Sequence, residues 1–267
     1  MNLTLFLHTL RSNALRLLVI AIAMAAWGSL MPLIYAHFGS QFRDMMNSGL
    51  IPKQLAQFGG GDLFSLPGAI AIGFIHPIAI ILSSVFAVGF ATAAIAGERQ
   101  RGTLEVLLAR PIPRRVIYFT LLVCAFIFVA VVIGAFLVGA YLSATVNGVI
   151  GEIPADRLLV VWLNGLLLFG AIAAIGLAAS VSFDRLSPAL GITLAIVLVS
   201  YFLQILGSLW PDAQGLQPYS LFHYLDPKAV LTTGASTFDF GLLAGVALVA
   251  IVAALVIFPR RDLAAPS

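Results

Sequence analysis

Apolar residues dominate the chain in six runs of about 20 residues, which shorter polar segments separate. About 20 residues of helix cross the ~30 Å hydrocarbon core of a bilayer. The pattern therefore predicts six spanning helices, at 15–36, 69–96, 116–146, 158–183, 188–210 and 241–258. No Asp, Glu, Lys or Arg lies in the middle of any run. We expect an all-α membrane protein, with residues 1–267 forming one transmembrane domain.

Charged residues sort by side once these spans are placed. Of the 267 residues, 61% are hydrophobic and only 9% charged, which excludes an ordinary water-soluble domain. If the N-terminus is cytoplasmic, ten of the 14 Lys and Arg residues lie on the inner side. They are Arg11, Arg16, Arg99, Arg101, Arg110, Arg114, Arg115, Arg185, Arg260 and Arg261. The positive-inside bias then places both termini in the cytoplasm. We expect the chain to lie in the cytoplasmic (inner) membrane, with membrane lipid as a partner. Because topology explains the excess of positive charge, no nucleic acid is expected as a partner.

Residues 1–13 carry Leu3, Phe6, Leu7 and Leu10 on one helical face. An N-terminal interfacial helix on the inner leaflet explains this face, and a frayed start of the first span is the alternative. The apolar run that follows continues to Ala36, which is too long for the core of a cleaved signal peptide.

Two longer segments, 37–68 and 211–240, are predicted to lie outside. The second keeps Leu, Phe and Tyr between its prolines, which favours a re-entrant helical loop between the fifth and sixth spans. Within the second span, Pro77 lacks the amide that would bond the carbonyl of Gly73, so we expect a kink there.

No catalytic pattern is found in the spans. His76 has no acidic partner nearby in the sequence, and a hydrogen-bonded packing histidine is favoured over an intramembrane catalytic residue. The sequence contains no phosphate-binding loop and no intramembrane charge that could bind a driving ion. A transporter of this composition must therefore receive its energy from another protein.

Small residues recur at spacings that permit close helix packing. They are Gly89, Ala93 and Gly97 in the second span, Gly170, Ala174 and Ala178 in the fourth, and Gly241 and Gly245 in the sixth. Packing within the bundle is the first interpretation, and contact with a second subunit is the alternative.

The segment 94–115 concentrates seven charged residues in the sequence AIAGERQRGTLEVLLARPIPRR. Between Gly102 and Pro111 it predicts a helix of two turns, because Thr103 can cap its start and proline disfavours helix just before itself. Three leucines share one face of this helix: Leu104, Leu107 and Leu108. Anchoring to anionic lipid accounts for the arginines. A docked protein accounts in addition for Glu98 and Glu105 and for the bracketing glycine and proline.

At GERQRGTLEVLLARPIPRR the sequence resembles the membrane subunits of ABC-2 type transporters, the six-helix permeases of ATP-driven exporters. The similarity extends over the whole chain, including the ending FPRRDL at 258–263. It implies that the loop after the second span carries a coupling helix that fits a cleft on a separate ATPase. The residues it assigns to docking are Glu98, Gly102, Thr103, Leu104, Glu105, Leu107, Leu108, Arg110, Pro111 and Arg114. Two positions depart from the family pattern: Gln100 stands where an acid is common, and Pro113 where a serine often precedes the arginine.

The resemblance implies an assembly of two ABC ATPase subunits with this permease and a second permease copy or homologue. ATP and Mg²⁺ would be bound by the ATPase and no cofactor by this chain, which would not itself be an enzyme. The alternative is a membrane anchor or a mechanotransmission subunit that transmits force and moves no substrate.

Overall fold

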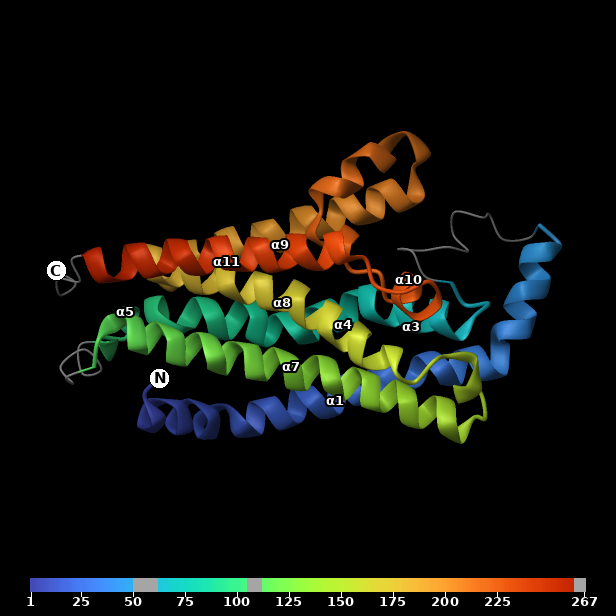
Figure 1. Ribbon diagram of the computed structural model, residues 1–267, viewed down its shortest axis with the longest axis horizontal. Coiled ribbons are helices and arrows are strands. Elements are labelled where there is room, and N and C mark those ends of the chain that lie inside the picture. Colours follow the sequence, from blue (N-terminus) through green and yellow to red (C-terminus); the bar gives the residue numbers. More distant parts are fainter. Residues whose placement is uncertain (50–61, 105–111, 262–267) are drawn as a thin grey trace.

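The computed structural model describes residues 1–49, 62–104 and 112–261, and this part of the chain contains helices, turns and no strand (Figure 1). Five helices are long and apolar enough to cross a membrane. They are α1 (Leu3–Asn47), α7 (Arg114–Val146), α8 (Arg157–Ser182), α9 (Leu186–Leu209) and α11 (Thr237–Arg260). A bent helical pair between α1 and α7 makes a sixth if it counts as one span. The all-α membrane fold is confirmed, and the exact count of six stays a prediction.

The spanning helices run along the long axis of the bundle (Figure 1). The first turns of α1, the short helix α5 (Glu98–Gln100) and the last turns of α11 lie at one end. We call this the inner end, because the sequence predicts it to be cytoplasmic. The helices α3 (Leu66–Ile75) and α10 (Pro227–Thr232) lie at the other, outer end. Helices α7 and α8 are the most buried of the five and form the centre of the core.

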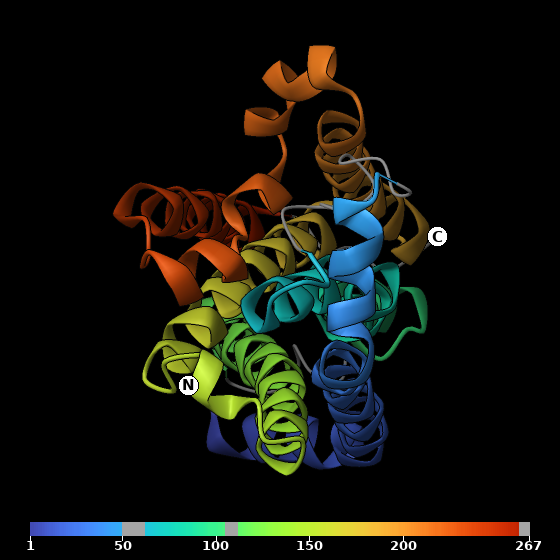
Figure 2. The ribbon, with the colours of Figure 1, turned by 90° about the vertical axis from the view of Figure 1, so that its right-hand side faces the viewer.

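Helix α1 corrects the expected boundary of the first span. The sequence predicts that a loop begins at residue 37, but the helix continues without interruption to Asn47. The apolar run ends near residue 36, and hydropathy marks the end of the apolar environment, which need not be the end of the helix. Viewed along the bundle, the first turns of α1 run sideways while the following turns are seen nearly end-on (Figure 2). This course agrees with an interfacial N-terminal segment that continues directly into the span.

Helices α1 and α7 approach so closely that their backbones touch. A Cβ atom added to Gly139 would lie 2.0 Å from the carbonyl oxygen of Ala25. One added to Gly28 would lie 2.1 Å from the carbonyl oxygen of Phe136. Glycine at both positions is therefore a requirement of this contact.

We expect Gly139→Ala to destabilise the bundle by about 3 kcal/mol, because the new methyl group meets backbone that cannot move aside. The measurement is the thermal unfolding midpoint in detergent. Gly245→Ala on α11 is the matched control, since no described atom lies within 4 Å of a Cβ at that position. Equal midpoints for the two variants would contradict the close contact.

The second span is broken in its outer half, as Pro77 predicts. Helix α3 is followed by α4 (Pro77–Ser84), and the chain bends by 51° between Leu66–Ile75 and Pro77–Phe90. The carbonyl of Gly73, which loses its helical partner to the proline, accepts a hydrogen bond of 2.9 Å from Trp27 Nε1 on α1. His76 lies at the break, where its Nδ1 accepts from the amide of Ile78 and its ring lies 4.5 Å from the Trp27 ring. The prediction of a kink is confirmed, and α1 supplies the missing donor.

The inner half of the second span is wound as a π-helix over two segments, which the sequence analysis did not foresee. These are η2 (Val85–Phe90) and η3 (Ala93–Gly97), and α5 follows directly. π-Helical turns are rare and are frequent at functional sites. Here they lead directly into Glu98, the first charged residue of the segment 94–115.

The expected outer loop between α9 and α11 is helical over most of its length. It contains two 3₁₀ segments, η5 (Pro211–Tyr219) and η6 (Leu221–Tyr224), and then α10. The buried Asn164 of α8 donates to the carbonyl of Tyr224 (2.9 Å) and accepts from the amide of Asp226 (3.2 Å). Whether the loop enters the membrane stays a prediction.

An ion pair between the buried Asp62 and the half-buried Lys228 joins the segment just before α3 to the start of α10. Asp62 Oδ2 lies 2.7 Å from Lys228 Nζ, and Asp62 Oδ1 accepts hydrogen bonds from the amides of Phe64 and Ser65. Burial by itself would raise the pKa of Asp62, but Lys228, Ser65 and Phe64 stabilise the carboxylate and hold the pKa below its ordinary value. The ionised form of Asp62 therefore stabilises the contact between the start of α3 and α10.

We expect Asp62→Asn to lower the free energy of unfolding at neutral pH by about 2 kcal/mol, because hydrogen bonds to a charged group are lost. A lowered folded-state pKa gives stability that is present above the unfolded-state pKa and is lost as the pH falls through the lowered pKa. The difference between wild type and variant should therefore begin to shrink below about pH 4, the ordinary pKa of an aspartate, and vanish only when the pH falls below the lowered pKa of Asp62. Unfolding midpoints measured against pH test this, with the exposed Asp44→Asn as control. A difference that persists unchanged in acid would refute it.

Candidate functional site

The segment that the sequence singles out begins with a sharply terminated helix end. Gly102 adopts the left-handed conformation, with φ of 73°. Its amide donates to the carbonyl of Arg99 (3.0 Å), and the amide of Thr103 donates to the carbonyl of Glu98 (3.0 Å). This pair of bonds is a Schellman motif, which ends α5. Gly102 is therefore required by the backbone at this turn.

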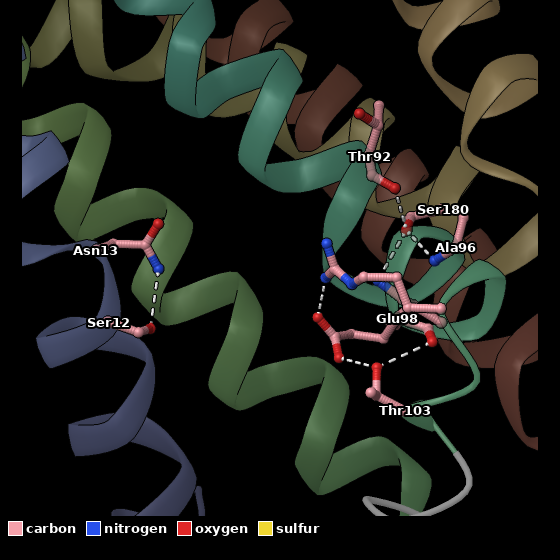
Figure 3. A network of polar contacts seen from close by, with 9 residues as sticks. Ser12, Asn13, Thr92, Ala96, Glu98, Thr103 and Ser180 are labelled. Carbon is pink, nitrogen blue, oxygen red and sulfur yellow. Dashed lines mark hydrogen bonds and ion pairs between the residues drawn. The ribbon is translucent and has the colours of Figure 1, made fainter.

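Glu98 forms its side-chain contacts with residues of the same turn. Its carboxylate forms an ion pair with Arg101, and the hydroxyl of Thr103 lies 2.5 Å from Glu98 Oε2 and 3.1 Å from the Glu98 carbonyl (Figure 3). The sequence predicts that Thr103 caps the start of the following helix. The structure shows that its hydroxyl closes the preceding helix end.

Two further residues of α5 reach the corner between α8 and α9. Arg99 Nη1 lies 2.5 Å from Asp184 Oδ1, and the Gln100 side-chain oxygen accepts a 3.0 Å bond from the amide of Leu186. That amide is in the first turn of α9, where the helix itself offers no acceptor. Gln100, which replaces an acid common in the resembled family, thus caps α9.

Arg114 ties the second end of the segment, where the chain enters α7, to the bundle. Helix α7 begins at this residue, directly after Pro113. Arg114 Nη1 donates to the carbonyl oxygens of Phe258 (3.2 Å) and Arg261 (2.7 Å) at the end of α11. The Arg114 guanidinium therefore binds carbonyl groups at the C-terminal end of α11.

Leu104 is 3% exposed and belongs to the hydrophobic core, so it faces the bundle. The remaining residues assigned to docking lie outside the described residues, and so does the expected two-turn helix. They are Glu105, Leu107, Leu108, Arg110 and Pro111. The structure thus places the two stems of the segment, at Glu98–Leu104 and Ile112–Arg114. The docking role of the residues between the stems stays a prediction.

A cavity of about 460 Å³ adjoins this turn at the inner end. The first turns of α1 form one wall, and the inner half of the second span with the stem of α7 forms the other. Polar side chains of α1, including Ser12 and Asn13, which are bonded to each other, line it together with Glu98 and Thr103 (Figure 3). The end of the second span is thus open towards α1 and bonded towards α8 and α9.

The small residues singled out as packing candidates fall in different environments. Ala174 is fully buried, and a Cβ on Gly170 would lie 2.9 Å from the Phe126 ring. Gly89, Ala93 and Gly97 belong to the π-helical segments, and Ala178 packs partly buried against the core. Gly241 and Gly245 have no described atom within 4 Å of an added Cβ. The close α1–α7 contact instead uses Gly28 and Gly139, which the sequence analysis did not single out.

The described contacts of His76 are structural ones, a helix cap and a ring stack. Among the described residues no three His, Cys, Asp or Glu side chains come close enough together to hold a metal ion.

Comparison with known protein families shows to which family the chain belongs. A family model described as "ABC-2 family transporter protein" matches residues 6–263, almost the whole chain. The chain belongs to the ABC-2 transporter family. It is thus a multi-pass membrane protein and the permease subunit of an ABC transporter. In this family the membrane component lacks the ATPase site. An ABC ATPase is implied as its partner. Comparison with curated proteins gave no significant match.

Sequence reasoning missed the residues of this permease that brace the segment against the bundle, namely Ser180, Asp184 and Arg261. One signal was available. Asp184 is an acid in a very short inner connection, next to Arg185 and on the side where arginines gather. Its partners could not be read from the chain, because Arg99 and Arg261 lie 85 and 77 positions away.

We expect Gly102→Ala to cost about 1–2 kcal/mol locally, because a residue with a Cβ is strained in the left-handed conformation. Amide exchange at Thr103 should therefore rise. Gly148→Ala is the matched control, since Gly148 also has φ of 73° and closes α7 with the same pair of bonds. It should raise exchange at Val149 and leave Thr103 unchanged. Unchanged exchange at Thr103 in Gly102→Ala would contradict the assignment.

Proposed function

We propose that this permease exports a substrate across the cytoplasmic membrane, driven by ATP hydrolysis on a separate ATPase subunit that docks on the segment 97–115. The ATPase would bind the ATP and Mg²⁺, and this chain would bind neither. Two ATPase subunits and two permease chains would form the assembly, the second permease being a copy or a homologue.

The observation that carries the proposal is the bracing of both stems of the segment. Gln100 and Arg99 tie one stem to the α8–α9 corner, and Arg114 ties the other to the end of α11. A loop that only anchors the chain to lipid needs no bonds to three other helices. Stems bonded in this way would pass a force applied to the loop into the spanning helices.

The composition of the spans supports an external energy source. The carboxylates of the described helices lie towards the helix ends, and the deeper Arg16 is bonded to the carbonyl of Val85, so no described carboxylate at depth would bind and release a driving ion. Exposed apolar side chains cover much of α1, α9 and α11, which leaves surface for lipid and for a second permease.

Co-purification with an ABC ATPase that is co-expressed with the permease tests the docking. We expect Leu107→Asp to abolish recovery of the ATPase, because an acid is placed on the apolar face predicted to enter its cleft. Glu98→Lys should weaken recovery as well, since it also breaks the ion pair with Arg101.

Arg185→Glu is the control, a charge reversal at an exposed site on the same end of the bundle but outside the segment. Size-exclusion profiles should show that all three variants fold. An intact complex with both Leu107→Asp and Glu98→Lys would refute docking on this segment. ATP turnover that never responds to any exported compound would instead favour a mechanotransmission subunit.

A further inference from the structure

We propose that Ser180, Asp184 and Gln100 are positioning residues that join the inner end of the second span to the α8–α9 corner as one mechanical unit. A force on the segment 97–115 would then reach α9 through this joint. The inference rests on the proposed function for the origin of the force. The joint itself rests on three contacts of different chemistry within a short stretch of the second span.

Ser180 supplies the most buried of these contacts. Its hydroxyl, which is fully buried on α8, accepts from the amides of Ile95 (3.0 Å) and Ala96 (2.9 Å) and donates to the carbonyl of Thr92 (2.7 Å) (Figure 3). A serine hydroxyl has one donor and two acceptor sites, and all three are used. Ser180 thus satisfies backbone groups of η3, so the π-helical winding and the position of α8 depend on each other.

Asp184 supplies an ionic contact two residues beyond the end of α8. It forms ion pairs with Arg99 of α5 and with Arg261 at the end of α11. The guanidinium side chains are only 14% and 20% exposed, although the carboxylate itself is 62% exposed. Arg261 also donates to the carbonyl of Val181 (2.7 Å). Isolated surface ion pairs contribute little, but one carboxylate shared by two largely covered arginines fixes the relative position of three helix ends.

Gln100 completes the joint at the start of α9, through its bond to the amide of Leu186. On the opposite side the same end of the second span borders the cavity beside α1. A push on the segment therefore meets bonded partners at α8 and α9 and open space at α1. Because the segment is bonded on one side only, we expect the α8–α9 corner to move with it.

Amide exchange on the permease alone in lipid nanodiscs tests the joint without any partner. We expect Ser180→Ala to raise exchange of the amides of Ile95 and Ala96 about tenfold, because both lose their acceptor in a buried site. Ser182→Ala is the matched control, since its hydroxyl bonds only Ala178 in its own helix. Gln100→Ala changes an exposed side chain and should raise exchange at Leu186 even if Ser180→Ala folds poorly. Exchange that is the same in all three variants and the wild type would overturn the joint.

Exchange in the complex with the co-purified ATPase tests transmission. Trapping with ATP and vanadate should change exchange in residues 92–104 and 180–190 together in the wild type. In Asp184→Asn combined with Gln100→Ala the first segment should still respond and the second should not. Asp156→Asn, at the outer start of α8, is the control. A 180–190 segment that responds equally in the double variant would overturn the inference. Failure of the wild type to retain any ATPase would overturn the proposed function instead, and the measurements on the permease alone would still decide the joint.

Discussion

Each backbone amide and carbonyl inside a membrane must find a hydrogen-bond partner within the protein, and the second span meets this requirement in an irregular way. It departs from α-helical winding at the break before Pro77 and again in η2 and η3. At each departure another helix supplies the partner. Trp27 bonds the carbonyl of Gly73, and Ser180 bonds the backbone of η3. The irregular span is therefore stable only in the presence of its neighbours.

These partners also fix the arrangement of the bundle. Near the start of η2, Arg16 of α1 donates to the carbonyl of Val85 (3.2 Å) and lies over the Phe86 ring. Helix α1 thus holds the outer break and the first π-helical segment, and α8 holds the second. The close backbone contact at Gly28 and Gly139 in turn seats α1 against α7. The most irregular helix is the one most dependent on side chains from elsewhere in the chain.

Charge at the inner end serves two purposes that the sequence does not separate. Arginines collect there in any protein that obeys the positive-inside bias. In the structure, Arg114 and Arg261 are also bonded to backbone carbonyls at the ends of other helices. The charge that sets the topology therefore also ties together the helix ends around the segment 97–115, on which we propose that the ATPase docks.

The sequence alone determined the helical membrane fold, the position of the kink and the segment that we propose as the docking site. These follow from local properties, namely apolar run length, the missing amide of Pro77 and the bracketing of the charged segment by Gly102 and Pro111. Only the tertiary structure decided that α1 continues to Asn47, that the inner half of the second span is π-helical, and that Asp184 joins three helix ends. The reason is that a hydrogen bond or ion pair between residues some 80 positions apart depends on how helices pack, and no local pattern records that packing.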